Sequence, residues 1–423
     1  MITQFFHKLS VVFTDRALRT RIFFLLAAIA VFRFLSAIPV PGVNRAALEQ
    51  FFQSNQFLGL LNVFSGGGFS HISLVLLGVG PYITASIIMQ LATVIFPQVK
   101  EMYSEEGEAG RTRFISISRM ITVPIAIVQG IAFLTLLETQ GILNPLSRAA
   151  FAGDVLVVAA GSLLLMWIGE LITEFGIGNG VSLIIFAGIV SRLPSGISQA
   201  LFSATTANIP AYIGFALLAL AVIYAVVMVA DAERSIPIAY ARQGRTGGGT
   251  NAATYLPIRL LQAGVIPIIF ALSLLLLPQL AIAGLSALHV GGMATASRFY
   301  AAFAANAWEY SAVYFALVVM FTYFYTAITF EPKRVADNLQ KSGAFVPGVR
   351  PGRETESYIA TVVNRITLPG ALFLGLVAVI PFIIKGLTGI SAILVGGTAL
   401  LIAVQVLLDL VRKIDAQVSL REY

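Results

Sequence analysis

The stretch FLGLLNVFSGGGFSHISLVLLGVGPYITASIIMQLATVIF, residues 57–96, decides the fold of this chain. Its second part, Ile72 to Phe96, holds no charge and, at ~1.5 Å per residue, is long enough to cross a hydrocarbon core of about 30 Å. Its first part, Leu58 to Phe64, reaches only ~10 Å as a helix and runs into three glycines. Unsatisfied peptide groups in hydrocarbon cost several kcal/mol each, so this part must lie in protein or in a water-filled cavity.

Composition places the whole chain in a membrane. Of its 423 residues, 58% are hydrophobic and 11% are charged, and the mean hydropathy is +0.89. We therefore predict an all-α integral membrane protein. The chain has no cysteine, which excludes disulfides, thiolate metal sites and a cysteine nucleophile. No A-x-A-like site follows the first apolar run, so we expect no cleaved signal peptide.

Ten segments are apolar and long enough to be predicted as transmembrane helices: 21–38, 72–96, 114–137, 154–173, 181–200, 210–230, 258–280, 310–330, 366–384 and 389–411. An even number of spans puts both termini on one side. The N-terminal segment and the loops near 97–119, 231–259, 331–365 and 412–423 hold 21 of the 27 Lys and Arg residues. The positive-inside rule therefore predicts that both termini are cytoplasmic.

Orientation places the glycine-rich segment on the outer side. The first predicted helix leaves the membrane externally at the sequence IPVPG, residues 38–42, and the second ends at Pro97 before a basic cytoplasmic loop. Residues 58–69 are therefore predicted to dip into an external cavity and return, ahead of an interruption at Gly80-Pro81. The alternative is an amphipathic loop on the membrane surface.

Two long cytoplasmic loops are candidates for docking surfaces. In the first, residues 231–259, an alternating pattern predicts a strand at 235–240 and a hairpin around Gly247-Gly248-Gly249, with positive charge from Arg242, Arg245 and Arg259. In the second, residues 331–357, a helical pattern ends near Gly343, and the turns Pro347-Gly348 and Pro351-Gly352 hold Arg350 outward. Basic loops of this kind bind lipid headgroups or a protein or ribonucleoprotein partner, and the sequence leaves both open.

No catalytic or cofactor site is indicated. The glycine-rich run GRTGGGTN, residues 244–251, lacks the Gly-Lys-Ser/Thr ending of a phosphate loop. The three histidines His7, His71 and His289 lie far apart, so they predict neither a metal site nor a catalytic triad. Glu170 and Glu174 are expected at a solvated helix end, with a proton relay as the alternative. We expect no enzyme, no cofactor and no metal.

Charge is scarce inside the predicted helices. A small-solute carrier should bury ionisable groups, but Arg33, Asp154 and Arg192 lie near helix ends. Aliphatic side chains beside small residues stand at mid-membrane positions instead: Val79, Ile83, Val181, Ile185, Ile269 and Ile402. Periodicity alone makes these ordinary packing residues.

Several strings along the chain resemble motifs of the SecY family, in the same order. They are IPVPG at 38–42, NVFSGGGFS at 62–70, GVGPYITASIIMQL at 78–91, GEAGR at 107–111, EFGIGNGVSLIIFAGIV at 174–190, QAGVIPIIF at 262–270 and ADNLQKSGAFVPGVRPG at 336–352. The resemblance spans nearly the whole length. It implies a protein-conducting channel that moves secretory polypeptides across the membrane and releases membrane segments sideways.

The resemblance also implies an architecture of two inverted halves, residues 1–205 and 206–423, although no internal repeat is apparent in the sequence. The re-entrant segment becomes a plug that includes Asn62, Phe64, Ser65, Gly66, Gly67, Gly68 and Phe69. The six aliphatic residues named above become a pore ring. A lateral gate is implied between the second and seventh helices, with Thr84, Ser86 and Gln90 on one side and Gln262, Gly264 and Pro267 on the other.

Partners follow from the same resemblance. It implies homologues of SecE and SecG in the membrane, and the motor SecA or a translating ribosome on loops 231–259 and 331–357, with Arg350 as the main contact. It implies the bacterial cytoplasmic membrane as the location. Two rival functions are a secondary transporter with inverted repeats and a membrane scaffold that only recruits partners.

Overall fold

A computed structural model describes residues 14–40, 73–104, 107–139, 141–144, 147–191, 194, 198, 209–240, 254–287, 293–388 and 397–419. The predicted plug, residues 58–69, and the docking residues Arg242 and Arg245 lie outside these ranges. Nothing in the structure therefore tests those predictions.

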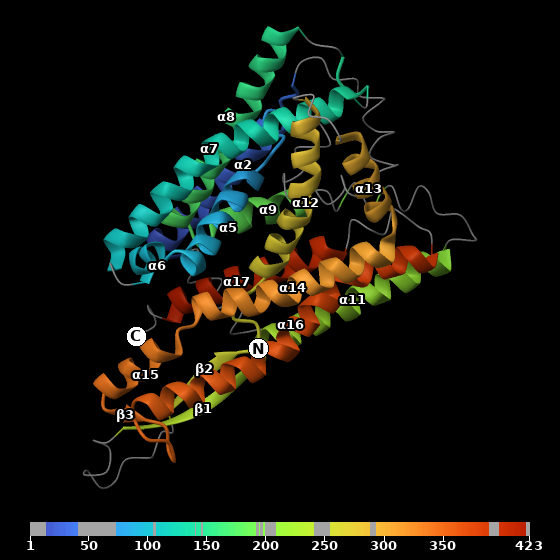
Figure 1. The fold of residues 1–423 in the computed structure, drawn as a ribbon. Helices are drawn as coiled ribbons and strands as arrows, with labels where there is room; N and C mark the ends of the chain where they lie inside the picture. Colours follow the sequence, from blue (N-terminus) through green and yellow to red (C-terminus); the bar gives the residue numbers. More distant parts are fainter. Residues whose placement is uncertain are drawn as a thin grey trace.

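The described residues are mainly helical. The first part of the chain contains α2 (Arg16–Ala37), α5 (Gly80–Ile95), α6 (Pro97–Ser104), α7 (Gly107–Thr139), α8 (Arg148–Phe175) and α9 (Gly180–Val190). The second contains α11 (Ile209–Asp231), α12 (Ile266–Ala287), α13 (Met293–Ala305), α14 (Ala307–Thr329), α15 (Pro332–Lys341), α16 (Arg353–Thr388) and α17 (Gly397–Ser419). Figure 1 shows α2, α5, α7 and α8 in one group, α11, α14, α16 and α17 in another, and α12 running between them.

Each of the ten predicted segments contains a helix: α2, α5, α7, α8, α9, α11, α12, α14, α16 and α17. By length and composition, five helices within the described ranges could cross a membrane, or six if α5 and α6 form one span bent by 113°. Helix α9 and parts of α11 and α12 are shorter apolar helices. A helical, multi-pass membrane protein is confirmed, whereas the number of ten spans stays a prediction.

The predicted helices 72–96 and 258–280 start too early, and Pro81 and Pro267 lie at the start of a helix rather than inside one. Residues 74–79 form turns, and α5 begins at Gly80 with Pro81 as its second residue. Pro267 is likewise the second residue of α12. The first-turn amides of a helix have no partner within the helix, so proline costs no hydrogen bond there. Pro81 and Pro267 therefore mark where the two helices begin, and only Pro278 lies inside α12.

The structure reveals an internal repeat that sequence inspection misses. Gly78-Val79-Gly80-Pro81 and Gly264-Val265-Ile266-Pro267 share the pattern G-V-x-P, and both leading glycines have φ +56°. This is the left-handed region that favours glycine. The helix begins two residues later in both cases. Each repeat thus turns the chain sharply into the start of a helix.

The repeat extends to the segments that precede it. The amide of Leu74 donates to the Ile38 carbonyl (2.9 Å), just after α2, and the amide of Leu260 donates to the Ala232 carbonyl (2.9 Å), just after α11. Antiparallel pairing follows in both places, with Pro39 opposite Ser73 and Glu233 opposite Arg259. The same order therefore occurs twice: a helix, a backbone hydrogen bond that closes a neck (Leu74 to Ile38, Leu260 to Ala232), a G-V-x-P turn and a second helix.

The two basic loops are not separate, because they share a small folded unit. Strands β1 (Glu233–Tyr240), β2 (Thr254–Arg259) and β3 (Ala344–Phe345) form one sheet in the order β2-β1-β3. A hydrophobic cluster joins the sheet to the start of α16: Ile236, Ile258, Val346, Ile359 and Val363. We call this sheet with α15 and the start of α16 the sheet module (Figure 1).

Candidate functional site

The six predicted ring residues come together in one hydrophobic cluster. Val79, Ile83, Ile185, Ile269 and Ile402 are all buried in it, with at most 5% of each residue exposed, and Val181 packs against it. They come from the starts of α5 and α12 and from α9 and α17. Four helices separated by long stretches of sequence therefore contribute these aliphatic groups to one cluster, which also contains buried residues of α2, α8, α14 and α16, and their arrangement as a ring stays a prediction.

The predicted gate residues of α5 find partners other than α12. Thr84 is buried, donates to the Gly80 carbonyl (3.1 Å) and accepts from Nε2 of Gln129 on α7 (3.3 Å). Ser86 hydrogen-bonds to the side chain of Tyr82 on its own helix. The Gln90 Oε1 is buried without a partner among the described residues. Among the described residues, the hydrogen bond that these predicted gate residues make to another helix, from Gln129 to Thr84, thus joins α5 to α7.

Helix α7 also packs at the predicted gate, which sequence reasoning missed. α12 packs against both α5 and α7, and its contact with α7 is the more extensive. Gln129 is buried in an otherwise apolar part of α7. An isolated glutamine in an apolar span favours an interhelical hydrogen bond, and this signal was available in the sequence. The seam beside α12 is therefore built from two helices.

The turn before α5 is clamped to α8. The buried hydroxyl of Ser162 donates to the Gly78 carbonyl (2.7 Å). One residue earlier, Gly161 lies so close to Leu74 that an added Cβ would stand 2.0 Å from the Leu74 carbonyl oxygen. The segment before α12 is approached in the same way by α16, because an added Cβ on Gly370 would stand 2.7 Å from the Leu260 carbonyl oxygen, whereas Gly264 itself has only the Asp409 carboxylate, at 4.0 Å, near a Cβ.

One ion pair corrects the expected environment of Glu170. Its carboxylate accepts from Nε of Arg119 at 2.6 Å, joining α8 to α7, and only 17% of its side chain is exposed. Glu170 is thus a paired residue between two helices rather than a solvated helix end. The described residues hold no group of three or more His, Cys, Asp or Glu side chains placed to bind a metal.

Arg350 lies on a tightly built turn of the sheet module. Gly348 and Gly352 have φ of +83° and +98°, and the buried Thr355 hydroxyl donates to the Arg350 carbonyl (2.8 Å). The Arg350 side chain is 87% exposed and stands 3.9 Å from the Glu354 carboxylate. An exposed ion pair of this kind is weak, so the guanidinium is free to exchange Glu354 for a partner. The structure therefore fixes the backbone of Arg350 and leaves its guanidinium exposed to solvent.

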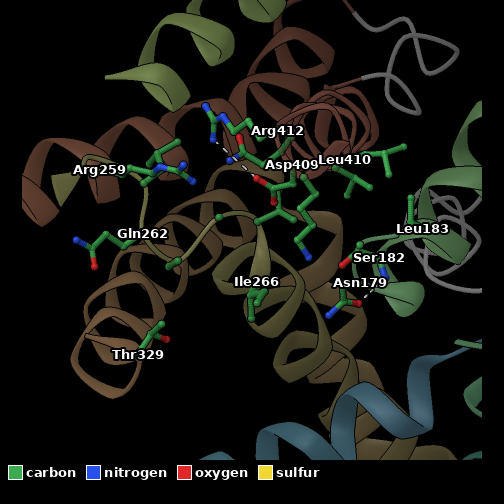
Figure 2. A pocket seen from close by; sticks show the side chains of 18 of the residues that line it. Asn179, Ser182, Leu183, Arg259, Gln262, Ile266, Thr329, Asp409, Leu410 and Arg412 are labelled. Carbon is green, nitrogen blue, oxygen red and sulfur yellow. Dashed lines mark hydrogen bonds and ion pairs between the residues drawn. The ribbon is translucent and has the colours of Figure 1, made fainter. Parts of the chain in front are cut away.

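A cavity of about 200 Å³ lies among α9, α12, α14 and α17 (Figure 2). It is lined by Asn179 and Ser182 of the α9 start, Arg259, Leu261 to Ile266, Thr329 of α14, and Gln405, Asp409, Arg412 and Lys413 of α17. The predicted gate residues Gln262 and Gly264 and the predicted docking residue Arg259 all line this cavity. Pro267, the next residue after Ile266, is buried.

Arg412 ties the cavity wall to the sheet module. Its guanidinium donates to the Ala230 carbonyl (2.8 Å) and pairs with the carboxylates of Asp231 and, at 3.8 Å, Asp409. Because Asp231 ends α11 and β1 follows directly, α17 is linked to the base of the sheet. Arg412 is therefore already neutralised by its neighbours.

Helix α13 is held to α12 by a half-buried tyrosine. The Tyr300 hydroxyl donates to the Leu275 carbonyl (2.8 Å), and burial raises the pKa of Tyr300 to about 12. The phenol thus keeps its proton, and this hydrogen bond, at neutral pH.

Solved structures share this fold. A SecY structure described for a plug domain that stabilises the closed state of the translocation channel has a TM-score of 0.67 at 19% identity, covering 93% of this chain and 91% of that chain. Sec61 in the canine ribosome-channel complex has a TM-score of 0.61 at 18% identity, with the same coverage. The arrangement of helices is therefore that of the SecY and Sec61 channels.

Sequence relatives are closer. The protein translocase subunit SecY of Mycobacterium tuberculosis is 39% identical, over 96% of this chain and 96% of that protein. The subunit of the same name from Halalkalibacterium halodurans is 39% identical over 99% of both. The SecY family profile matches residues 73–411. Since this match and these identities extend over most of its length, the chain belongs to the SecY family.

Proposed function

We propose that this chain is a protein-conducting channel, the central subunit of a bacterial Sec translocase. The observation that carries the proposal is that aliphatic residues from α5, α9, α12 and α17 belong to one hydrophobic cluster, other members of which line a polar cavity. Curated relatives named protein translocase subunit SecY support it. The relatives give no support to the alternative of a small-solute carrier.

The decisive experiment places a photoreactive amino acid at Ile269 and asks whether a stalled secretory chain crosslinks to it. A channel requires the polypeptide to pass the ring, so a crosslink is expected. A solute carrier or a recruiting scaffold would never bring a polypeptide to Ile269, which is buried in the cluster. No crosslink from a chain shown to be engaged would therefore overturn the proposal.

The architecture proposed is ten transmembrane helices in two inverted halves, 1–205 and 206–423, in the bacterial cytoplasmic membrane with both termini inside. The repeated neck and G-V-x-P turn support two related halves. The basic sheet module supports the orientation, because the positive-inside rule puts it in the cytoplasm.

The lateral gate is proposed to open between α12 and the pair formed by α5 and α7. The seam hydrogen bond between Thr84 and Gln129 stays within the first half, so opening need not break it. The clamp of Ser162 on Gly78 holds the start of α5 to α8, whereas the Gly264 turn faces a cavity. We therefore expect α12 to move more than α5.

The plug is proposed to be residues 58–69. The SecY structure described above for its plug domain supports this reading of the glycine-rich segment. Deleting Asn62 to Phe69 is expected to leave the protein assembled and to raise the frequency of channel opening several-fold. A short half helix makes few contacts, and water can take its place in an external cavity. Single-channel recording tests this, and an unchanged opening frequency would contradict the plugging role.

Partners are proposed at two places. Homologues of SecE and SecG would contact the membrane-facing helices, and SecA or a translating ribosome would dock on the sheet module. Sec61 in its ribosome-channel complex supports the second assignment. The joining of both loops in one sheet also supports a single docking unit.

Arg350→Glu is expected to lower translocation in reconstituted vesicles about tenfold or more while leaving the protein folded. The turn backbone holds the side chain at a fixed place, so charge reversal repels an acidic partner surface, and like charges across an interface cost several kcal/mol. Arg353→Glu is the matched control, because it makes the same charge change at the start of α16, where a negative charge is favourable. Equal rates for the two variants would contradict a docking role for Arg350.

A further inference from the structure

Residues that line the cavity of Figure 2 stand three positions from predicted ring residues on three separate helices. Ser182 precedes Ile185 by three residues, Ile266 precedes Ile269 by three, and Gln405 follows Ile402 by three. Residues three apart share a helix face, about 4.5 Å apart along the axis. In the proposed channel, a polypeptide at the ring would therefore extend into this cavity, which Arg259 at the end of β2 also lines.

Gln405 is the unusual residue of this cavity. It is 1% exposed, it lines the cavity, and its Oε1 has no hydrogen-bond partner among the described residues. A buried acceptor without a donor is costly, so a side chain of this kind points to a ligand that brings a donor. The neighbouring amide Asn179 is different, because its Oδ1 already accepts from the Ser182 backbone amide (3.1 Å).

The surroundings of Gln405 favour a neutral donor over an anion. The Asp409 carboxylate stands one turn from Gln405 on α17 and lines the same space, so an anion at Gln405 would meet acceptors from both positions. Three cations also line the cavity: Arg412 is paired with Asp231 and Asp409, and the charges of Lys413 and Arg259 act on the Asp409 carboxylate. Each residue of an extended polypeptide except proline carries a backbone N–H that suits an unpaired amide oxygen.

We propose that Gln405 accepts a hydrogen bond from the backbone of the passing polypeptide and so positions it above the ring. This inference rests on the proposed channel function and names the contact by which the channel holds a chain of any sequence. A single backbone hydrogen bond is weak enough to be exchanged from residue to residue. Gln405 would act as a positioning residue that does not distinguish the side chains of the polypeptide.

The test uses two stalled secretory chains that differ in the segment within the cavity, one alternating Ala-Ser and the other Ala-Pro, in which half the backbone N–H groups are missing. A photoreactive amino acid replaces Thr329, an exposed residue at the cavity wall. In the otherwise unchanged protein, the Ala-Ser chain is expected to crosslink about two- to tenfold more than the Ala-Pro chain, the worth of one net hydrogen bond.

Gln405→Met keeps the length of the side chain and removes the acceptor, so the preference for Ala-Ser should disappear. Gln417→Met is the matched control. Gln417 lies on the same helix and also has a buried, unpartnered Oε1, but it is not among the residues that line the cavity, so the preference should persist. Equal yields from both chains before the change, or a preference that survives Gln405→Met, would overturn this inference alone. Absence of any crosslink from either chain, at Thr329 or at Ile269, would overturn the channel proposal and this inference with it.

Discussion

Replacing Gly161 by alanine is expected to abolish stable folding. The added Cβ would stand 2.0 Å from the Leu74 carbonyl oxygen and 2.8 Å from its carbon, far inside van der Waals contact. Both partners are backbone, so neither can rotate away, and α8 would have to separate from the turn before α5. Overpacking of this severity costs on the order of 3 kcal/mol or more. The yield and melting temperature of the detergent-solubilised protein measure the effect.

Gly153→Ala provides the control on the same helix. An added Cβ at Gly153 meets nothing within 4 Å, so this change should be neutral or slightly stabilising, because alanine has the higher helix propensity. If Gly161→Ala melted within about 2 °C of the unchanged protein, a shift too small for a loss of this size, the close approach of α8 to Leu74 would be wrong.

Ile269→Asn is expected to raise the ion conductance of the channel about two- to tenfold. The proposed ring consists of Val and Ile side chains, so an ion passing it must shed its hydration with nothing to replace it, and a narrow apolar constriction tends to dewet. Asparagine is of similar size but offers hydrogen bonds to water, each worth ~0.5–1.5 kcal/mol net, which stabilise a wetted column. Planar-bilayer recordings measure the change.

Ile269→Leu separates polarity from shape. Leucine has the same number of carbons and no polar group, so its conductance should stay at the original level. The asparagine variant should also accept substrates with defective signal sequences, because a wetted ring holds the closed state less firmly. Equal conductance for the two variants would assign the ion barrier to another part of the chain, such as the plug.

Much of the helical framework could be predicted, because long apolar segments fix the existence of helices. Each predicted span contains one, and the ring residues meet in one cluster. The starts of α5 and α12 were misplaced, because a proline in an apolar run looks the same at a helix start as inside it. Only the positive φ of Gly78 and Gly264 distinguishes the two cases.

Long-range pairings could not be predicted. β3 joins β1 through Ala239 opposite Phe345 and Tyr240 opposite Ala344, across about a quarter of the chain, and a two-residue strand has no periodicity of its own. Gln129 could have been noted as an isolated polar residue, but its partner Thr84 depends on how α7 packs on α5. In both cases tertiary contact, rather than local preference, decides the structure.

The two necks affect where the chain can accept inserted residues. Each neck is closed by its own hydrogen bond, Leu74 to Ile38 and Leu260 to Ala232, before the chain enters the following helix. Residues 41–72 and the segment around 241–253 are therefore tethered at both ends, and doubling the length of such a segment costs only about 0.6 kcal/mol of closure entropy. Insertions between each pair of anchors are therefore expected to leave the flanking helices in place, and these two positions are where a foreign domain should be grafted.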